Sequence, residues 1–230
     1  MSEPIYVAVI CEGPTERIFV EFMLAPHFQT LGIFMTPTVI TKKGQKGGNV
    51  KYNRLYNDLE MHLQQGHNHC VTTLFDFYGL TGDWPAYDEA RKKKSPAEKQ
   101  AVISSEVKQK ADKKLEEFRS FERFLPNFVM HEIEALYFSC PSTLAAKLGI
   151  NVTMVDAILA ECGEPEAINH DRRTSPSHRL GDLIGKNFRK TSTGIAIAQA
   201  IGLPKMRSAC PLFDQWVRKI EQLPVAKKLI

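Results

Sequence analysis

Several common signatures are missing from this sequence of 230 residues, and each absence argues against a class of protein. The five cysteines are scattered and form no CxxC pair, which argues against both a zinc knuckle and a disulfide framework. A GxxxxGK(S/T) loop is absent, so the chain is not itself a P-loop ATPase, and no GxSxG elbow points to a serine hydrolase. No apolar run approaches the roughly 20 residues of a membrane span.

A recognisable export signal is lacking as well. Glu3 stands before the first apolar run, where a signal peptide would carry a basic segment. Unpaired cysteines are typical of a reducing compartment, so we expect a cytoplasmic protein that crosses no membrane. The length fits one large domain, or one domain with an appendage, and a hydrophobic content of 43% is ordinary for a globular fold.

The net charge of +4 is small but unevenly distributed. Basic residues gather in a glycine-rich segment at 42–51, in the run 91–94 and between 172 and 190. Acidic residues instead follow the predicted strands. Carboxylates surrounded by basic loops are what a metal-dependent site for a polyanion requires. The alternative for each lysine is a solvated surface position.

Hydrophobic periodicity predicts alternating strands and helices over the first 140 residues. Strands are expected at 5–10, 36–41, 70–75 and 124–130, and helices at 15–31, 52–63 and 95–118. This order predicts an α/β domain at 1–140, with a mainly parallel sheet and helices on both faces. From 141 to 230 the apolar spacing is helical, which predicts a helical extension packed on the sheet.

The most informative motif is Cys-Glu-Gly-Pro-Thr-Glu at 11–16. It lies between an apolar strand and an amphipathic helix, which places Glu12 at the carboxyl end of the strand, where open α/β sheets bind ligands. Gly13 permits a tight turn and Pro14 suits a first helical turn. Glu12 and Glu16 are therefore candidates for a divalent metal site, and the alternative for Glu16 is an interaction with the helix dipole.

Two further predicted strands are followed by acids, namely Asp76 after the third strand and Glu132 with Glu134 after the fourth. Successive tips of parallel strands lie along one edge of a sheet. We therefore expect Glu12, Asp76 and one of the last two carboxylates within roughly 8 Å, the span of a one- or two-metal site. Their oxygen atoms favour Mg²⁺ or Mn²⁺. Glu132 is preferred over Glu134 because it is nearer the strand tip.

Crowding of these acids has a second consequence. At least one of them should have a raised pKa when no metal is bound, because like charges disfavour joint ionisation. His131, beside Glu132, is a candidate general acid, general base or metal ligand, with a structural role as the alternative.

The Glu-Gly turn after a first strand, the later Asp76-x-x-Gly79 and the acids at a further strand end resemble the Toprim fold. That fold is shared by topoisomerases, primases, maturase-type ribonucleases and overcoming-lysogenization-defect nucleases, and the form of 11–16 is most similar to the nuclease branch. The whole chain also resembles an uncharacterised bacterial Toprim-like family. That similarity extends into 166–169, 175–180, 190–194 and 201–216, and so covers nearly all 230 residues.

The resemblance implies a metal-dependent nuclease, or a nuclease-like effector, that acts on nucleic-acid phosphodiesters with Mg²⁺ or Mn²⁺. It maps the Toprim glutamate onto Glu12, the second glutamate of the nuclease branch onto Glu16, and the first aspartate of an Asp-x-Asp pair onto Asp76. The second aspartate is replaced by Tyr78, which leaves open whether one metal binds or a later acid substitutes.

The same family is often encoded beside a P-loop ATPase, in some cases in phage-defence loci, so such an ATPase is an expected partner. The rival interpretation is a non-catalytic scaffold that docks on the ATPase. Tyr78 favours this rival, whereas acids retained at three strand ends favour the enzyme.

A cation is also needed to hold a phosphate against the acids. The segment 169–190 is expected to fold back over the strand ends and bring Arg179 or Lys190 to them. Arginine suits this role because its planar fork binds phosphate bidentately. The alternative is that these residues pair with carboxylates and fix the loop. The candidate catalytic residues are Glu12, Glu16, Asp76, His131, Arg179 and Lys190, and the candidate metal ligands are Glu12, Asp76, Glu132 and Glu134.

Overall fold

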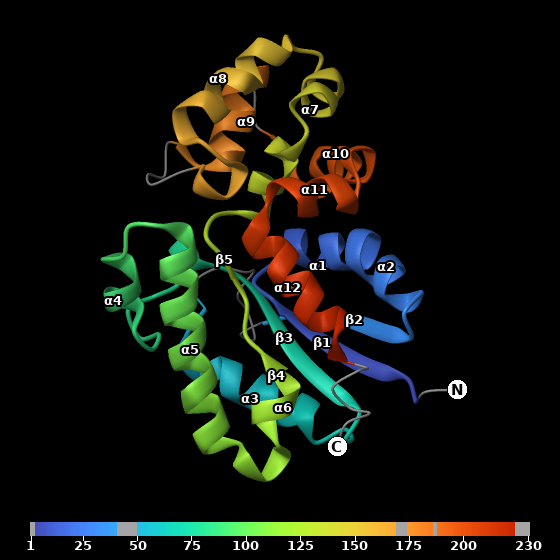
Figure 1. Ribbon diagram of the computed structural model, residues 1–230, viewed down its shortest axis with the longest axis vertical. Helices are drawn as coiled ribbons and strands as arrows, with labels where there is room; N and C mark the ends of the chain where they lie inside the picture. Colours follow the sequence, from blue (N-terminus) through green and yellow to red (C-terminus); the bar gives the residue numbers. More distant parts are fainter. Residues whose placement is uncertain (1–2, 41–49, 169–173, 186–187, 224–230) are drawn as a thin grey trace.

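The computed structural model describes residues 3–40, 50–168, 174–185 and 188–223. Its centre is a sheet of five parallel strands in the order β2-β1-β3-β4, with β5 also paired to β3 (Figure 1). The strands are β1 Ile5–Cys11, β2 Ile33–Val39, β3 His69–Asp76, β4 Phe124–Leu125 and β5 Phe128–Val129. The expected parallel α/β sheet is therefore confirmed.

The last predicted strand is interrupted rather than continuous. Pro126 has no N–H to donate to a ladder, so pairing stops after Leu125 and resumes at Phe128. The hydroxyl of Thr73 bridges the gap, because it donates to the carbonyl of Asn127 and accepts from the N–H of Asn127. The chain thereby keeps its direction and still delivers the residues after β5 to the same edge as the end of β3.

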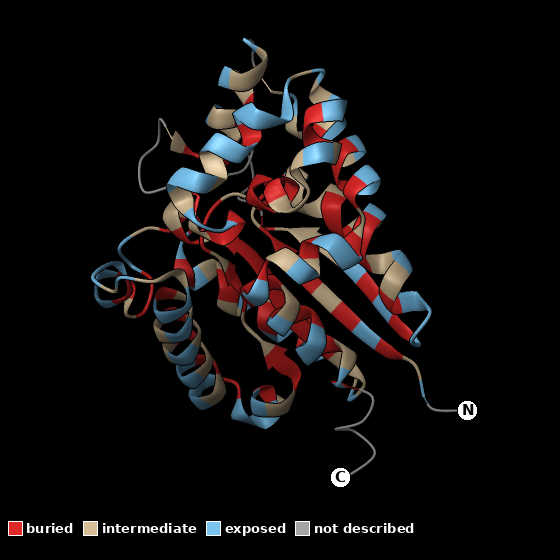
Figure 2. Cartoon of the chain, turned by 45° about the horizontal axis from the view of Figure 1, so that its top comes forward, coloured by how far each residue is buried: buried red, intermediate tan, exposed pale blue. Residues whose placement is uncertain are grey.

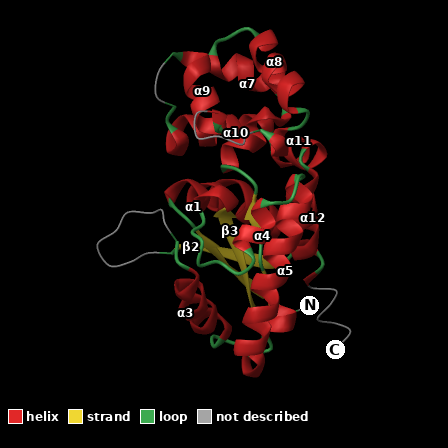
Figure 3. Ribbon diagram, turned by 90° about the vertical axis from the view of Figure 1, so that its left-hand side faces the viewer, coloured by secondary structure: helices red, strands yellow, loops and turns green. Residues whose placement is uncertain are grey.

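Helices cover both faces of the sheet, and each face has its own apolar cluster. One cluster joins alternate residues of β1, such as Val7 and Val9, to α1 Pro14–Phe19, α2 Ala25–Gln29 and α12 Pro211–Glu221. The other joins Ile10, Val71 and Phe75 to α3 Tyr52–Leu63 and α5 Pro96–Lys114. Figure 3 shows the strands between helices, and Figure 2 shows that the outer faces of the helices are exposed.

The helix predicted at 15–31 is divided into three parts. An α-helix gives way to a π-turn at Val20–Leu24, and α2 follows. Pro26 explains the widening, because it lacks an N–H and its ring displaces the carbonyl of the preceding turn. The helix predicted at 95–118 is α5, and Ser95 and Glu98 form the expected capping box. The short α4 Tyr87–Arg91 is not predicted by the periodicity.

The C-terminal segment is mainly helical, and its described residues from 141 onward contain no strand. Its helices are α7 Pro141–Leu148, α8 Val152–Cys162, α9 Pro176–Ile184, α10 Ile195–Ile201, α11 Leu203–Ala209 and α12. Figures 1 and 3 show α7 to α11 grouped beyond the carboxyl ends of β1 and β3.

The last helix fastens this extension to the sheet. In α12, the indole of Trp216 donates to the hydroxyl of Thr72 in β3 at 2.8 Å. The backbone N–H groups at the start of α12 donate to the carboxylate of Glu166. No helix in the described part of the chain is long and apolar enough to cross a membrane.

Candidate functional site

Glu12 leaves β1 at its carboxyl end and turns toward the end of β3. Its Oε2 accepts a hydrogen bond from the backbone N–H of Asp76 at 3.2 Å. A side chain at Gly79 would place its Cβ 2.9 Å from Oε1 of Glu12, so only glycine leaves this carboxylate undisturbed. The turn after β3 is therefore shaped around the acid that follows β1.

Asp76 ends β3 and caps the short turn after it, because its Oδ1 accepts from the N–H of Tyr78 at 2.9 Å. Its side chain lies in the field of three other carboxylates, those of Glu12, Glu132 and Glu16. The geometry thus brings acids from the ends of β1 and β3 together, as the sequence predicted.

Glu132 and Glu134 follow β5 on either side of the start of a 3₁₀ segment, Ile133–Ser139. Glu132 is fixed by three contacts: the N–H and hydroxyl of Ser177 donate to it at 2.8 Å each, and Nζ of Lys190 at 2.5 Å. Glu134 is fully buried, and neither of its oxygens has a hydrogen-bond partner. Its Oε1 lies 3.6 Å from Nζ of Lys190.

The acids differ in pKa because nearby positive charge and hydrogen bonds offset the effect of burial to different extents. Burial, with the nearby carboxylate of Glu16, raises the pKa of Glu12 to about 7. Burial, with Glu12, raises the pKa of Asp76 to about 8. Burial also raises the pKa of Glu134 to about 7, although Lys190 opposes the shift. The cluster therefore holds protons near neutral pH that isolated carboxyls would release.

The remaining acid and the cation of the cluster stabilise each other. Burial alone would raise the pKa of Glu132, but Lys190 and Ser177 outweigh it and hold the pKa below its usual range. Burial alone would lower the pKa of Lys190, but Glu134 and Glu132 outweigh it and raise the pKa. Lys190 is thus charged at neutral pH. Among the described residues, it is the cation that contacts this cluster.

Glu16 lies in the first turn of α1, on the same side as Glu12. Burial raises its pKa, and backbone N–H groups of Glu16 and Gly13 offset part of that rise. The two roles considered for Glu16 coincide here, since it meets the start of the helix and belongs to the carboxylate cluster.

His131 and Tyr78 pack against each other beside the acids. Their rings are stacked, with centroids 5.0 Å apart and an interplanar angle of 7°. His131 is buried, in accord with the structural alternative for it. The hydroxyl of Tyr78 accepts from Nζ of Lys99 at 2.8 Å. Lys99 was not predicted to lie here, and its place in a strongly charged helix gives no signal that would have found it.

Arg179 pairs with Glu161 rather than with the acids, so of the two cations expected at this edge, Lys190 is the one that contacts them. Its guanidinium forms a bidentate pair with Glu161 in α8, at 2.8 and 3.0 Å, and also donates to the carbonyl of Thr174. It therefore fixes the start of α9, which was the alternative considered for it. Lys190 is the residue brought to the acids. The basic residues at 42, 43, 46, 172 and 173 lie outside the described residues.

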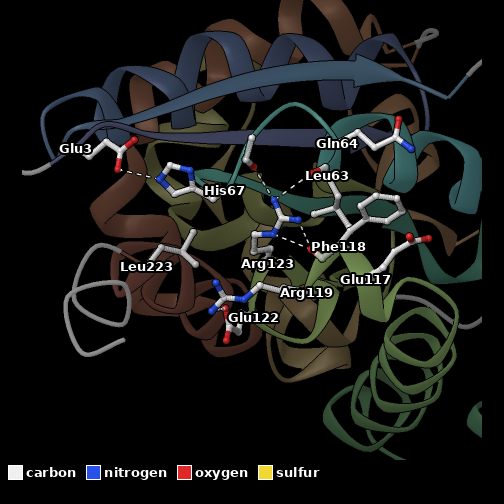
Figure 4. Close-up of a pocket in the computed structure, with 11 residues that line it drawn as sticks. Glu3, Leu63, Gln64, His67, Glu117, Phe118, Arg119, Glu122, Arg123 and Leu223 are labelled. Atoms are coloured by element: carbon white, nitrogen blue, oxygen red, sulfur yellow. Dashed lines mark hydrogen bonds and ion pairs between the residues drawn. The ribbon is translucent and has the colours of Figure 1, made fainter.

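A cavity of about 750 Å³ lies at the end of the sheet away from the acids, between segments that precede β1 and β3 (Figure 4). Its buried cation is Arg123, whose guanidinium donates to the backbone carbonyls of Leu63, Gly66 and Phe118. Figure 4 shows this guanidinium turned toward those carbonyls. The arginine holds these backbone segments together, and none of the clustered acids lines this cavity.

The donor atoms of the cluster are of the kind that a divalent metal prefers. Glu12, Asp76, Glu132 and Glu134 all offer carboxylate oxygens, and the two of Glu134 are buried and lack hydrogen bonds. Among the described residues, no group of three or more acids, histidines or cysteines is already arranged to hold an ion. The ammonium of Lys190 instead contacts Glu132 and Glu134, so a metal would bind them only after this ammonium had moved.

A comparison with protein families matches residues 11–221 to a domain of unknown function, DUF4276. No curated protein and no solved structure matches the chain. The matched region begins at Cys11, the last residue of β1, and ends with α12, so it spans most of the sheet and the helical extension. The chain therefore belongs to the DUF4276 family, a family of domains of unknown function.

Proposed function

We propose that this protein is a Toprim-like phosphodiesterase that cleaves nucleic acid with the help of Mg²⁺ or Mn²⁺. The observation that carries the proposal is the gathering of Glu12, Asp76 and Glu134, all with raised pKa values, at one edge of a parallel sheet. Holding several acids together in a buried place is unfavourable for folding, which is expected when the place serves a ligand.

Glu12, Asp76, Glu132 and Glu134 would hold the ion, and Glu16 would complete the charge around it. A bound divalent cation would supply electrostatic stabilisation of a phosphodiester and of the oxygens that attack and leave it. Lys190 would donate hydrogen bonds to the phosphate, because its ammonium already points at the acids. In the metal-free protein, Glu132 orients that ammonium, and Ser177 holds Glu132 in place.

Metal binding by the EDTA-treated protein tests this proposal. Isothermal titration should detect Mn²⁺ binding to the parent and its loss in Glu12→Gln and Asp76→Asn, whereas the exposed Glu161→Gln should bind like the parent. A nuclease assay with Mn²⁺ on single-stranded DNA, duplex DNA and RNA should show cleavage that both site variants abolish. Absence of Mn²⁺ binding by the folded parent would contradict the proposal.

A second candidate is a non-catalytic scaffold that docks on an ATPase. Two observations favour it: position 78 is tyrosine, and Lys190 neutralises two of the acids without any metal. The titration separates the candidates, since a scaffold whose acids are neutralised internally has no need of Mn²⁺. Mn²⁺ binding without any cleavage would favour a metal-binding scaffold over the enzyme.

A further inference from the structure

A cavity of about 580 Å³ adjoins the carboxylate cluster. It shares Ser177 and Lys190 with the cluster, the same two residues that bind Glu132. The remainder of its described lining comes from α9 and from the segment just before Lys190: His178, Gly181, Asp182, Gly185 and Phe188. A phosphate held by Lys190 would therefore have this space directly beside it.

Phe188 contributes an aromatic ring to the cavity, and this ring packs against Tyr137. The ring lies 6.4 Å from that of Tyr137, which is almost fully buried. A side chain at Gly194 would meet Cε1 of Phe188 at 3.5 Å and the hydroxyl of Tyr137 at 3.1 Å. Glycine at position 194 thus leaves room for both rings to pack against each other. A ring fixed in this way loses little conformational entropy when a flat ligand stacks on it.

The α9 side of the cavity is kept open. Gly181 lies inside the helix and Gly185 ends it four residues later, so both fall on one helical face. A glycine inside a helix is less favourable for helix stability than an alanine, and here it leaves room over the cavity. Asp182 and Ser177 supply polar groups at the margin, and the His178 ring is fixed by Ser175, with Nδ1 2.8 Å from the hydroxyl oxygen.

We propose that this cavity receives one unpaired nucleobase of a single-stranded nucleic acid, stacked on Phe188 and next to the phosphate that Lys190 holds. The inference rests on the proposed phosphodiesterase function and names its substrate class. Its size suits a flat heterocycle with its sugar, and aromatic stacking with a nearby cation is the usual way to hold single strands. A base paired inside a duplex cannot enter, because its faces are covered by its neighbours.

Binding can be measured without metal, in EDTA, by fluorescence anisotropy. The probes are a fluorescein-labelled single strand of about 12 nucleotides, its abasic counterpart with the same phosphates, and a hairpin duplex of similar charge. The parent should bind the single strand at least about fivefold more tightly than either the abasic strand or the duplex, the lower limit for one stacked base. DNA and RNA versions of each probe show which sugar is preferred.

Variants of Phe188 test whether its ring causes the preference for a single strand that carries bases. Phe188→Leu should reduce binding of the single strand at least about fivefold and leave the abasic strand unchanged. Phe188→Trp should retain the preference. Phe121→Leu, at an aromatic residue that is exposed in α6 Ser120–Arg123, is the matched control and should bind like the parent.

Equal binding of the abasic and normal strands by the parent would overturn the inference, as would failure to bind single strands or an unchanged preference in Phe188→Leu. The comparison of probes uses the parent alone and stands even if a variant does not fold. Mn²⁺ binding with no preference for single strands would overturn this inference and leave the proposed function in place.

Discussion

Nζ of Lys190 lies 2.5 Å from Oε1 of Glu132, although 58 residues separate them in the chain. Glu132 follows β5, whereas Lys190 opens a π-turn in the helical extension. The contact therefore joins the extension to the sheet at the edge where the acids gather. Because Nζ also lies near Glu134, one ammonium compensates two carboxylates, and its removal should affect both.

Lys190→Met should lower the free energy of unfolding by roughly 1–3 kcal/mol at pH 8, less than for a fully buried pair because the ammonium is partly exposed. The loss should shrink at pH 5, where Glu134 can bind a proton instead. Urea unfolding at both pH values measures this, with Lys190→Arg as the charge-preserving control. An equal loss at both pH values would show that a proton on Glu134 does not replace the ammonium.

Asp76→Asn should stabilise the metal-free protein while it abolishes Mn²⁺ binding. The pKa of Asp76 is about 8, so its ionisation near neutral pH is unfavourable, and the amide removes that charge. The expected gain is on the order of 1 kcal/mol at pH 8, which corresponds to a few degrees in Tm for a chain of this size. Differential scanning calorimetry with and without Mn²⁺ measures both effects. A variant that lost stability and still bound Mn²⁺ like the parent would place Asp76 outside the site.

The metal-free protein should become less stable as the pH rises from about 5 to 8. Asp76 keeps its proton to about pH 8, and Glu12 and Glu134 to about pH 7, whereas unfolded carboxyls release theirs near pH 4. In this window the folded state binds more protons than the unfolded state, so the free energy of unfolding falls as the pH rises. Each carboxyl contributes up to about 1.4 kcal/mol per pH unit.

Urea unfolding from pH 5 to 8 tests this slope. Glu166, outside the cluster, has a pKa raised to about 7 by burial and contributes with the same sign. The part of the slope that belongs to the site is therefore the part that saturating Mn²⁺ removes and that Asp76→Asn reduces. Stability that rose with pH in the metal-free protein would contradict the protonation of these acids.

The positions of Glu12 and Asp76 could be predicted because strand tips follow from simple rules. Each acid comes directly after an apolar run, and parallel strands of one sheet end along a common edge. The same reasoning ranked Glu132 above Glu134 by nearness to the strand. It could not foresee that Glu132 is occupied by Ser177 and Lys190, because those contacts depend on how α9 and the π-turn fold back.

The cations show where such reasoning stops. Arg179 and Lys190 were equal candidates, since both lie in one basic segment far from the sheet in sequence. The choice between them depends on Glu161 in α8, which binds Arg179 and turns it away. Lys99 lies next to Tyr78 through the packing of α5, and no local pattern distinguishes it from the exposed lysines of that helix.

Arg179→Ala should accordingly leave Mn²⁺ binding and any cleavage unchanged. Its partner Glu161 is mostly exposed, so solvent screens the pair and it contributes little to stability. Activity of the variant beside that of Lys190→Met checks the assignment of the phosphate-binding cation. A large loss of activity in Arg179→Ala, with normal folding, would mean that the arginine leaves Glu161 when substrate binds.

Gly79→Ala should lower the affinity for Mn²⁺ while it changes the stability of the fold only slightly. The added Cβ would lie 2.9 Å from Oε1 of Glu12, and the carboxylate is a flexible group that can move aside. The free energy of unfolding should therefore change by less than about 1 kcal/mol, a minor effect among point mutations. Glu12 would lose its contact with the N–H of Asp76, and affinity for Mn²⁺ should fall about 10-fold or more, as when the support of a metal ligand is removed.

Gly82→Ala is the matched control, because nothing lies within 4 Å of a Cβ at that position. Titration of both variants with Mn²⁺ decides the matter: equal affinities would show that the position of Glu12 seen here is not the one that binds metal.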